Sequence, residues 1–155
     1  MSLCGLTAGI KRLSRPSRAG TVTFGKIAMT AKTCPTESEE QQAVMAYAEW
    51  LSNRMPEAGL LFHIPNGGAR TAVTGARMKA EGVKKGFPDL MLPVARGGYH
   101  GLFIEMKRRQ GGRVSPEQAG WLRNLEVMGY CTAVCFGADD AIKVIDDYLR
   151  GNIYK

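Results

Sequence analysis

The stretch Gly86-Phe87-Pro88-Asp89-Leu90-Met91-Leu92 is followed, ten residues on, by Leu102-Phe103-Ile104-Glu105-Met106-Lys107. Both are short apolar runs of the kind that form strands, the first with an acid near its start and the second with charges at its end. Side chains at i and i+2 of a strand share a face, so Glu105 and Lys107 project together and the methionine between them projects the other way. If the two strands pair as a hairpin, Asp89 can lie beside Glu105.

Two carboxylates and one ammonium group would then meet at one end of this hairpin. Metal-assisted hydrolysis of a phosphodiester requires oxygen ligands for a hard cation such as Mg²⁺, and a positive group beside the attacking water or the phosphate. A carboxylate at the end of an apolar strand is costly to bury unless it is paired or binds a metal. The alternative interpretation is a buried ion network of Asp89, Glu105 and Lys107 with a purely structural role.

A first helix is predicted from Glu37 to about Asn53, opened by a capping box that begins at Thr36. Its apolar stripe, extended back by one and two turns, places Glu37 and either Glu40 or Gln41 on the face that packs on the core. Acids in a first turn also complement the helix dipole, so the pattern alone leaves a structural role open.

A later helix starts at Ser115-Pro116, with Ser as N-cap and Pro at the first position, and ends at Gly129. Gln118 lies on its apolar face, one turn before Leu122. The order of elements is helix, strand, helix, strand, strand, helix, strand, helix, which predicts an α/β fold with a mixed four-stranded sheet and helices on its faces. The remaining predicted elements are a strand over Gly59–Ile64, a helix from Ala72 to about Glu81, a strand over Tyr130–Phe136 and a helix over Ala138–Leu149.

The length of 155 residues and the 45% hydrophobic content predict one domain with a tail. We expect a mobile basic extension over residues 1–34, the domain over 35–150 and a short tail over 151–155. No stretch approaches the roughly 20 apolar residues that span a bilayer.

The net charge of +7 is unevenly distributed along the chain, and outside the N-terminal extension its basic part is the middle of the domain. Residues 70–113 carry ten Lys or Arg and three Asp or Glu, a net +7 around the proposed acidic site. Such a local basic field suits a polyanion such as nucleic acid. Asn66 and the glycines that follow it allow the backbone to approach a ligand closely, although an ordinary turn explains these residues nearly as well. The candidates for contact with nucleic acid are Asn66, Arg70, Arg77, Lys79, Lys84, Lys85, Arg108, Arg109 and Arg113.

Two of the four cysteines, Cys131 and Cys135, share one side of a predicted buried strand. A zinc site needs four ligands, but the chain has two histidines and neither neighbours a cysteine pair. Free thiols in a reducing compartment are the favoured interpretation.

The ordered motifs resemble the PD-(D/E)xK nuclease superfamily, and in particular the VRR-NUC domain in its small stand-alone versions from phages and bacteria. The similarity covers about residues 36–149 and implies a restriction-endonuclease-like αβββαβ core with extra helices. It rests on Gly86-x-Pro88-Asp89, Ile104-Glu105-Met106-Lys107, Ser115-Pro-x-Gln118 and His63-Ile-Pro-Asn-Gly-Gly-x-Arg70.

The resemblance implies that Asp89 and Glu105 bind Mg²⁺ or Mn²⁺, that Lys107 is the catalytic lysine and that Gln118 supports the site through Lys107 or a water. It assigns the family's acid on the first helix to Glu37, also a candidate metal ligand, with Glu40 as the second choice.

The implied activity is hydrolysis of DNA phosphodiester bonds, with selectivity for junction, flap or branched DNA, in the cytoplasm of a bacterial or phage-infected cell. A role in DNA repair or recombination would follow, and junction cutting would favour a homodimer. The alternative is a non-catalytic nucleic-acid-binding module of a repair or packaging assembly.

Overall fold

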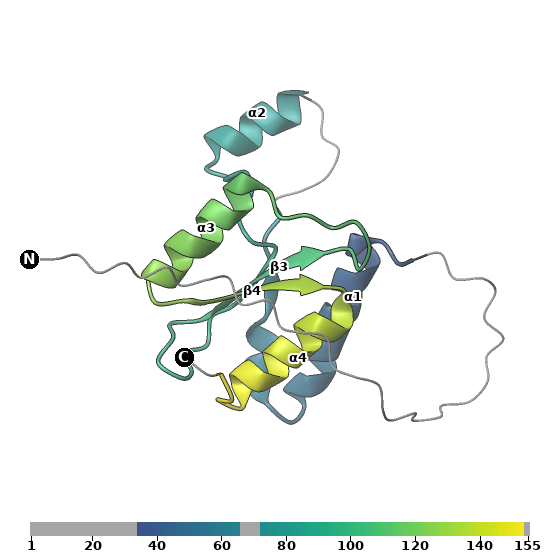
Figure 1. Cartoon of the computed structure of the whole chain (residues 1–155), viewed down its shortest axis with the longest axis vertical. Helices are drawn as coiled ribbons and strands as arrows, with labels where there is room; N and C mark the ends of the chain where they lie inside the picture. Colours follow the sequence, from purple (N-terminus) through teal and green to yellow (C-terminus); the bar gives the residue numbers. More distant parts are fainter. Residues whose placement is uncertain (1–33, 66–71, 154–155) are drawn as a thin grey trace, which may run out of the picture. The chain divides into compact units, whose positions relative to one another are not determined.

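The computed structural model describes residues 34–65 and 72–153. The expected extension over residues 1–34 lies almost wholly outside these ranges, as do Asn66 and Arg70. No helix in the described part of the chain is long and apolar enough to cross a membrane. The elements, in chain order, are α1 (Glu37–Ser52), the 3-10 helix η1 (Pro56–Leu60), β1 (Phe62–His63), α2 (Ala72–Ala80), β2 (Leu90–Leu92), β3 (Leu102–Lys107), α3 (Pro116–Val127), β4 (Cys131–Phe136) and α4 (Ala138–Leu149) (Figure 1).

The four strands form one sheet in the order β1-β2-β3-β4. β1 pairs with β2, and β2 with β3, in antiparallel fashion, whereas β3 and β4 are parallel. The predicted hairpin of β2 and β3 is confirmed, with Leu90 opposite Ile104. The next pair outward in this register sets Asp89 opposite Glu105. The predicted α/β fold with a mixed four-stranded sheet and flanking helices is therefore confirmed.

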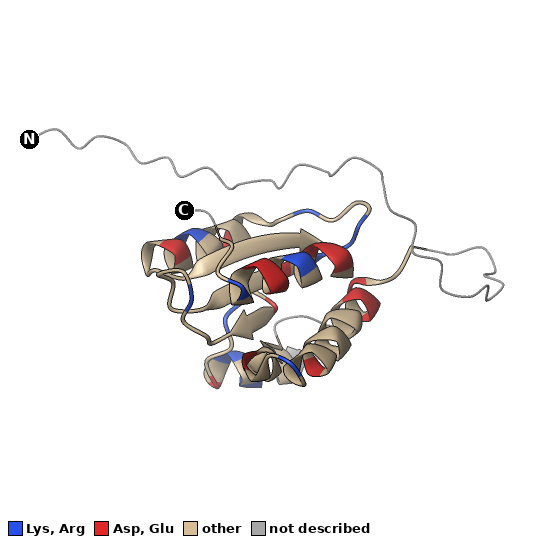
Figure 2. Ribbon diagram, turned by 90° about the horizontal axis from the view of Figure 1, so that it is seen from below, with Lys and Arg blue, Asp and Glu red and all other residues tan. Residues whose placement is uncertain are grey.

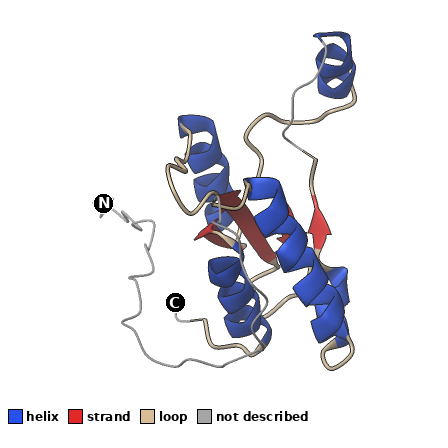
Figure 3. Ribbon diagram, turned by 90° about the vertical axis from the view of Figure 1, so that its right-hand side faces the viewer, coloured by secondary structure: helices blue, strands red, loops and turns tan. Residues whose placement is uncertain are grey.

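β3 is buried along its whole length and separates two different environments (Figure 3). Its even-numbered residues, Leu102, Ile104 and Met106, belong to the main apolar core with residues of α1 and α4. Its odd-numbered residues lie on the opposite face, where Phe103 packs edge-on against Phe87 and Tyr130. The alternation of a strand thus places Glu105 and Lys107 on the α3 side of the sheet.

Both predicted capping boxes are present. Thr36 and Glu39 exchange hydrogen bonds at the start of α1, and Ser115 and Gln118 do so at the start of α3. Each box pairs backbone N–H groups that the first turn of a helix would otherwise leave without acceptors. The second box has a consequence for the site, because it fixes the side chain of Gln118.

The start of α4 is stabilised from a distance. Its N-cap residue is Gly137, which has no side chain to accept a hydrogen bond. Glu40, a buried residue of α1, accepts the backbone N–H of Ala138 through Oε2 at 2.7 Å instead. The same carboxylate accepts Nε and Nη2 of Arg109, at 2.5 and 3.1 Å. Glu40 therefore joins α1, α4 and the segment after β3. In Figure 2 the Asp and Glu residues of the helices are coloured red.

The first strand is shorter than the sequence predicts. Residues Gly59 and Leu60 belong to η1, not to a strand, and β1 contains only Phe62 and His63. Pro56 stands at the first position of η1, where its fixed φ favours a helical turn. That turn includes the first two residues of the segment predicted as Gly59–Ile64.

Cys131 and Cys135 occupy the face of β4 that turns towards the main core, and both are free thiols. Burial raises the pKa of Cys131 to about 11 and that of Cys135 to about 12, so neither thiol is activated at neutral pH. Within the described ranges no group of three His, Cys, Asp or Glu side chains is arranged to hold a metal ion.

Candidate active site

Asp89 lies at the entrance to β2 and is held by three hydrogen bonds. Its Oδ2 accepts the backbone N–H of Met106 at 2.9 Å, a bond between the two strands of the hairpin. Its backbone carbonyl accepts the N–H of Ile64 at 2.7 Å and lies 3.0 Å from Nδ1 of His63. The preceding Pro88 is buried, so the backbone that carries this carboxylate is fixed on both sides.

Glu105 is the most unusual group of the site, since its side chain is only 1% exposed. Its Oε1 accepts hydrogen bonds from Nζ of Lys107, at 2.5 Å, and from Nε2 of Gln118. Its Oε2 is buried and has no hydrogen-bond partner. Burial raises the pKa of this carboxyl to about 7; the Asp89 carboxylate adds to that effect and the Lys107 hydrogen bond opposes it.

Lys107 is also buried, at the end of β3. Besides Glu105 it donates to the backbone carbonyl of Met106, at 2.7 Å. Its own carbonyl accepts the N–H of Gly137 at 2.9 Å, which ties the end of β3 to the start of α4. Oε2 of Glu105 is buried without a hydrogen-bond partner while its carboxyl lies beside that of Asp89, so either a proton shared with Asp89 or a bound cation would satisfy it. A ligand-binding role for the cluster rests on this oxygen.

Gln118 is positioned by the capping box of α3. Its Oε1 accepts the backbone N–H of Ser115 at 2.9 Å, which turns Nε2 towards Glu105. The family resemblance implies support through Lys107 or a water, which stays a prediction. In the structure the amide of Gln118 donates to the Glu105 carboxylate that Lys107 also contacts.

The two candidate acids of α1, Glu37 and Glu40, have different surroundings. Glu40, the second choice for the helix acid, is occupied by Arg109 and the start of α4, and the Arg109 hydrogen bond lowers its pKa. Glu37 is partly exposed. It does not join Asp89 and Glu105 in a three-member cluster of potential ligands within residues 34–65 and 72–153. The role of Glu37 remains a prediction.

The basic residues predicted to contact DNA have different surroundings. Arg77 pairs with Glu81, and Lys85 pairs with Glu117, both at the surface. The guanidinium of Arg109 is shared between Glu40 and Asp139. These two carboxylates would therefore compete with a DNA phosphate for Arg109. The other described members of the set, Lys79, Lys84, Arg108 and Arg113, are exposed as well.

The segment before Asp89 rests on the first turns of α3, a contact that sequence reasoning missed. Nε1 of Trp121 donates to the carbonyl of Lys85 at 3.1 Å, and the Phe87 ring packs edge-on against Trp121. Gly86 has φ of +74°, and a Cβ there would lie 3.3 Å from the backbone N of Gln118. No motif in the sequence identifies this partner of Trp121.

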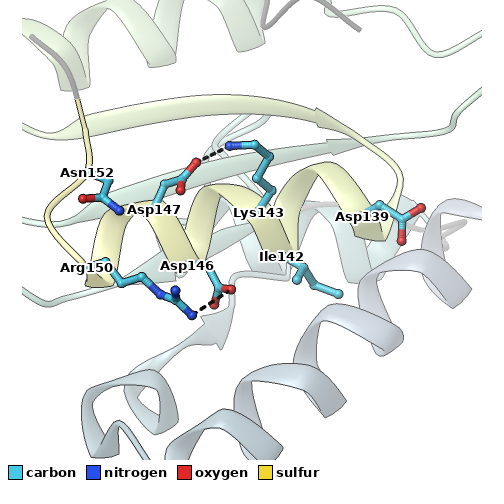
Figure 4. A pocket seen from close by; sticks show the side chains of 7 residues that line it. All are labelled: Asp139, Ile142, Lys143, Asp146, Asp147, Arg150 and Asn152. Carbon is cyan, nitrogen blue, oxygen red and sulfur yellow. Dashed lines mark hydrogen bonds and ion pairs between the residues drawn. The ribbon is translucent and has the colours of Figure 1, made fainter. Parts of the chain in front are cut away.

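A hollow on α4 lies on the other side of the sheet from this site (Figure 4). Four of its charged groups pair with one another, Lys143 with Asp147 and Arg150 with Asp146, and Asp139 pairs with Arg109. The hollow is lined by Asp139, Ile142, Lys143, Asp146, Asp147, Arg150 and Asn152.

Comparisons with known proteins identify the family of this fold. The model of the VRR-NUC domain family matches residues 33–139. A solved structure described as a VRR_NUC domain protein is 34% identical, with a TM-score of 0.65, and the match covers 77% of this chain and 93% of that one. No curated protein matches the chain. The chain belongs to the VRR-NUC domain family, whose members have a nuclease-type activity on DNA.

Proposed function

We propose that this protein is a divalent-metal-dependent DNA endonuclease of the PD-(D/E)xK type. The observation that supports this most directly is Oε2 of Glu105, a buried carboxylate oxygen without a partner beside a second carboxylate, Asp89. A buried oxygen of this kind is expensive unless a proton or a cation occupies it.

The residues present suit Mg²⁺ or Mn²⁺. Asp89 and Glu105 would hold the ion, because Mg²⁺ commonly takes one or two carboxylates and keeps several waters. Glu37 is proposed to assist, through water or at a second ion. A bound divalent ion lowers the pKa of a coordinated water and neutralises charge on the phosphate as it is attacked.

The other side chains of the cluster have roles that follow from their contacts. Lys107 holds a positive charge beside Glu105 and is proposed to orient the attacking water and contact a phosphate oxygen. Gln118 is a positioning residue, since its amide restrains Oε1 of Glu105 and leaves Oε2 for the ion. The exposed cations Lys84, Arg108 and Arg113 are proposed to contact the DNA backbone.

The test is a cleavage panel of single-stranded, duplex, flap and four-way-junction DNA with Mg²⁺, with Mn²⁺ and with EDTA. The expected result is metal-dependent cleavage that EDTA stops, with a preference for branched DNA. Salt-sensitive DNA binding without cleavage under any metal would identify a binding module instead.

Metal binding is expected to depend on pH through Glu105. Because the pKa of this carboxyl is about 7 without metal, a proton competes with the cation below that value. The increase in melting temperature caused by Mn²⁺ should therefore be large about one unit above pH 7 and small about one unit below it. Differential scanning fluorimetry across this range measures the effect.

The matched control is Glu105→Gln, which cannot ionise and should show a small Mn²⁺ effect at every pH. A metal effect of equal size on both sides of pH 7 in the unaltered protein would contradict the role of Glu105.

A further inference from the structure

The face of the sheet that carries the candidate active site is covered unevenly. The pairing register aligns Phe62 of β1, Met91 of β2 and Phe103 of β3 in one row across the sheet. Phe103 is 4% exposed, under the aromatic rings of Phe87 and Tyr130. At the other end of the row Phe62 is 44% exposed. The row therefore runs from a packed aromatic cluster to an open aromatic surface.

This open surface lies on the same side as the catalytic carboxylates. Leu90 and Leu92 are fully buried on the core side of β2, whereas Met91 between them is only partly buried on the other side. Asp89 precedes Met91 by two residues and so shares its face. In the antiparallel pair of β1 and β2, Phe62 is opposite Met91 and diagonal to Asp89. Diagonal neighbours lie roughly 7–8 Å apart, which is within reach of a ring.

Burying a phenylalanine ring is worth about 1.5–3 kcal/mol, so the exposed face of Phe62 can contribute to the binding of a ligand that covers it. Its neighbour in the row, Met91, is a flexible apolar side chain that extends the surface towards Asp89. Exposed lysines, including Lys84, occur on the segment that leads back to β2. An exposed aromatic ring near a proposed phosphate-cleaving site, in a chain with exposed lysines, has the composition of a binding surface for single-stranded nucleic acid.

We propose that Phe62 stacks against an unpaired nucleobase of the DNA next to the scissile phosphate. The inference rests on the proposed nuclease function and narrows its substrate to DNA with an unstacked base beside the cut, such as a flap or a frayed junction arm. In a fully paired duplex every base already stacks on its neighbours, so Phe62 gains no partner. Stacking on a side chain accepts every base, so the selectivity is for structure and not for sequence.

The direct test places 2-aminopurine at successive positions of a single-stranded arm attached to a duplex and follows its fluorescence with the full-length protein in metal-free buffer. Stacking on Phe62 should change the fluorescence at one position near the junction. Phe62→Ala should remove that change and weaken binding of the armed DNA about tenfold, with blunt duplex affected little. Phe62→Tyr should behave as the unaltered protein does.

The matched control is Trp50→Ala, which removes an exposed aromatic ring from α1, the helix on the opposite side of the sheet. This variant should leave both signals unchanged. Circular dichroism of each variant separates a loss of stacking from a loss of fold.

A second measurement tests whether the contributions of the Phe62 ring and of the nucleobase to binding depend on each other. An abasic site at the responsive position should weaken binding by the unaltered protein, and should have little additional effect on Phe62→Ala. Independent, additive losses would overturn the proposal, as would an unchanged fluorescence response in Phe62→Ala. Because these readouts need no cleavage, a protein that stacks the base but does not cut would refute the nuclease function alone. One that cuts but shows no coupling would refute the stacking alone.

Discussion

Asp89→Asn and Glu105→Gln are each expected to reduce metal-dependent cleavage by at least about a thousandfold. Both changes keep the size of the side chain and remove one negative charge from a pair of carboxylates that would hold the cation. In Glu105→Gln an NH₂ group replaces one carboxylate oxygen, so the side chain no longer offers a negatively charged oxygen at the unpartnered Oε2 position. Single-turnover cleavage of the preferred DNA at saturating Mn²⁺ measures the loss.

The control for this prediction is Asp147→Asn, which removes a carboxylate of α4 on the other side of the sheet. It should cleave as the unaltered protein does. The free energy of unfolding of each variant, from urea titration, shows whether lost cleavage reflects lost fold. Cleavage by either site variant within about tenfold of the unaltered protein would refute the two-carboxylate site, because an intact ligand set is worth several kcal/mol.

The parts of this site that the sequence predicts are those determined by local periodicity. Alternation along β3 places Glu105 and Lys107 on one face, and the antiparallel register sets Asp89 opposite Glu105. The capping box of α3 is likewise local, and it also fixes the direction of Gln118. In each case the geometry depends on neighbours within a few residues or on a short hairpin.

The parts that the sequence does not predict depend on contacts between distant segments. The partners of Glu40 lie 69 and 98 residues away, so an acid on the inner face of a helix could equally have been a metal ligand. The exposure of Phe62 depends on which distant segments cover β1, and the local pattern of the sequence does not state that. The start of β1 differs from the expected residue because a local turn at Pro56 competes with strand pairing.

Glu40→Ala is expected to lower the free energy of unfolding by about 2–3 kcal/mol at neutral pH. The change leaves the N–H of Ala138 at the start of α4 without its acceptor, and Gly137 offers no side chain to replace it. It also removes one of the two acids that Arg109 contacts. We set the value below that of a fully buried ion pair, because Arg109 is 40% exposed and water screens its charge.

The pH dependence has a definite sign. The pKa of Glu40 is lower in the folded protein than its ordinary value of 4.5, so its stabilising effect is complete above that value. It is lost as the pH falls below 4.5 through the lowered pKa of the folded state. The difference in unfolding free energy between Glu40→Ala and the unaltered protein should therefore shrink in acid.

Two further variants separate the contributions of this carboxylate. Glu40→Gln keeps an oxygen for the N–H of Ala138 but loses the charge, so it should be less destabilising than Glu40→Ala. In Arg109→Ala the buried Glu40 keeps only the Ala138 bond, and the double variant should be more stable than the sum of the single losses predicts. Exact additivity would show that Glu40 and Arg109 act independently. A folded Glu40→Ala protein that no longer binds Mn²⁺ would assign the metal role on α1 to Glu40 rather than to Glu37.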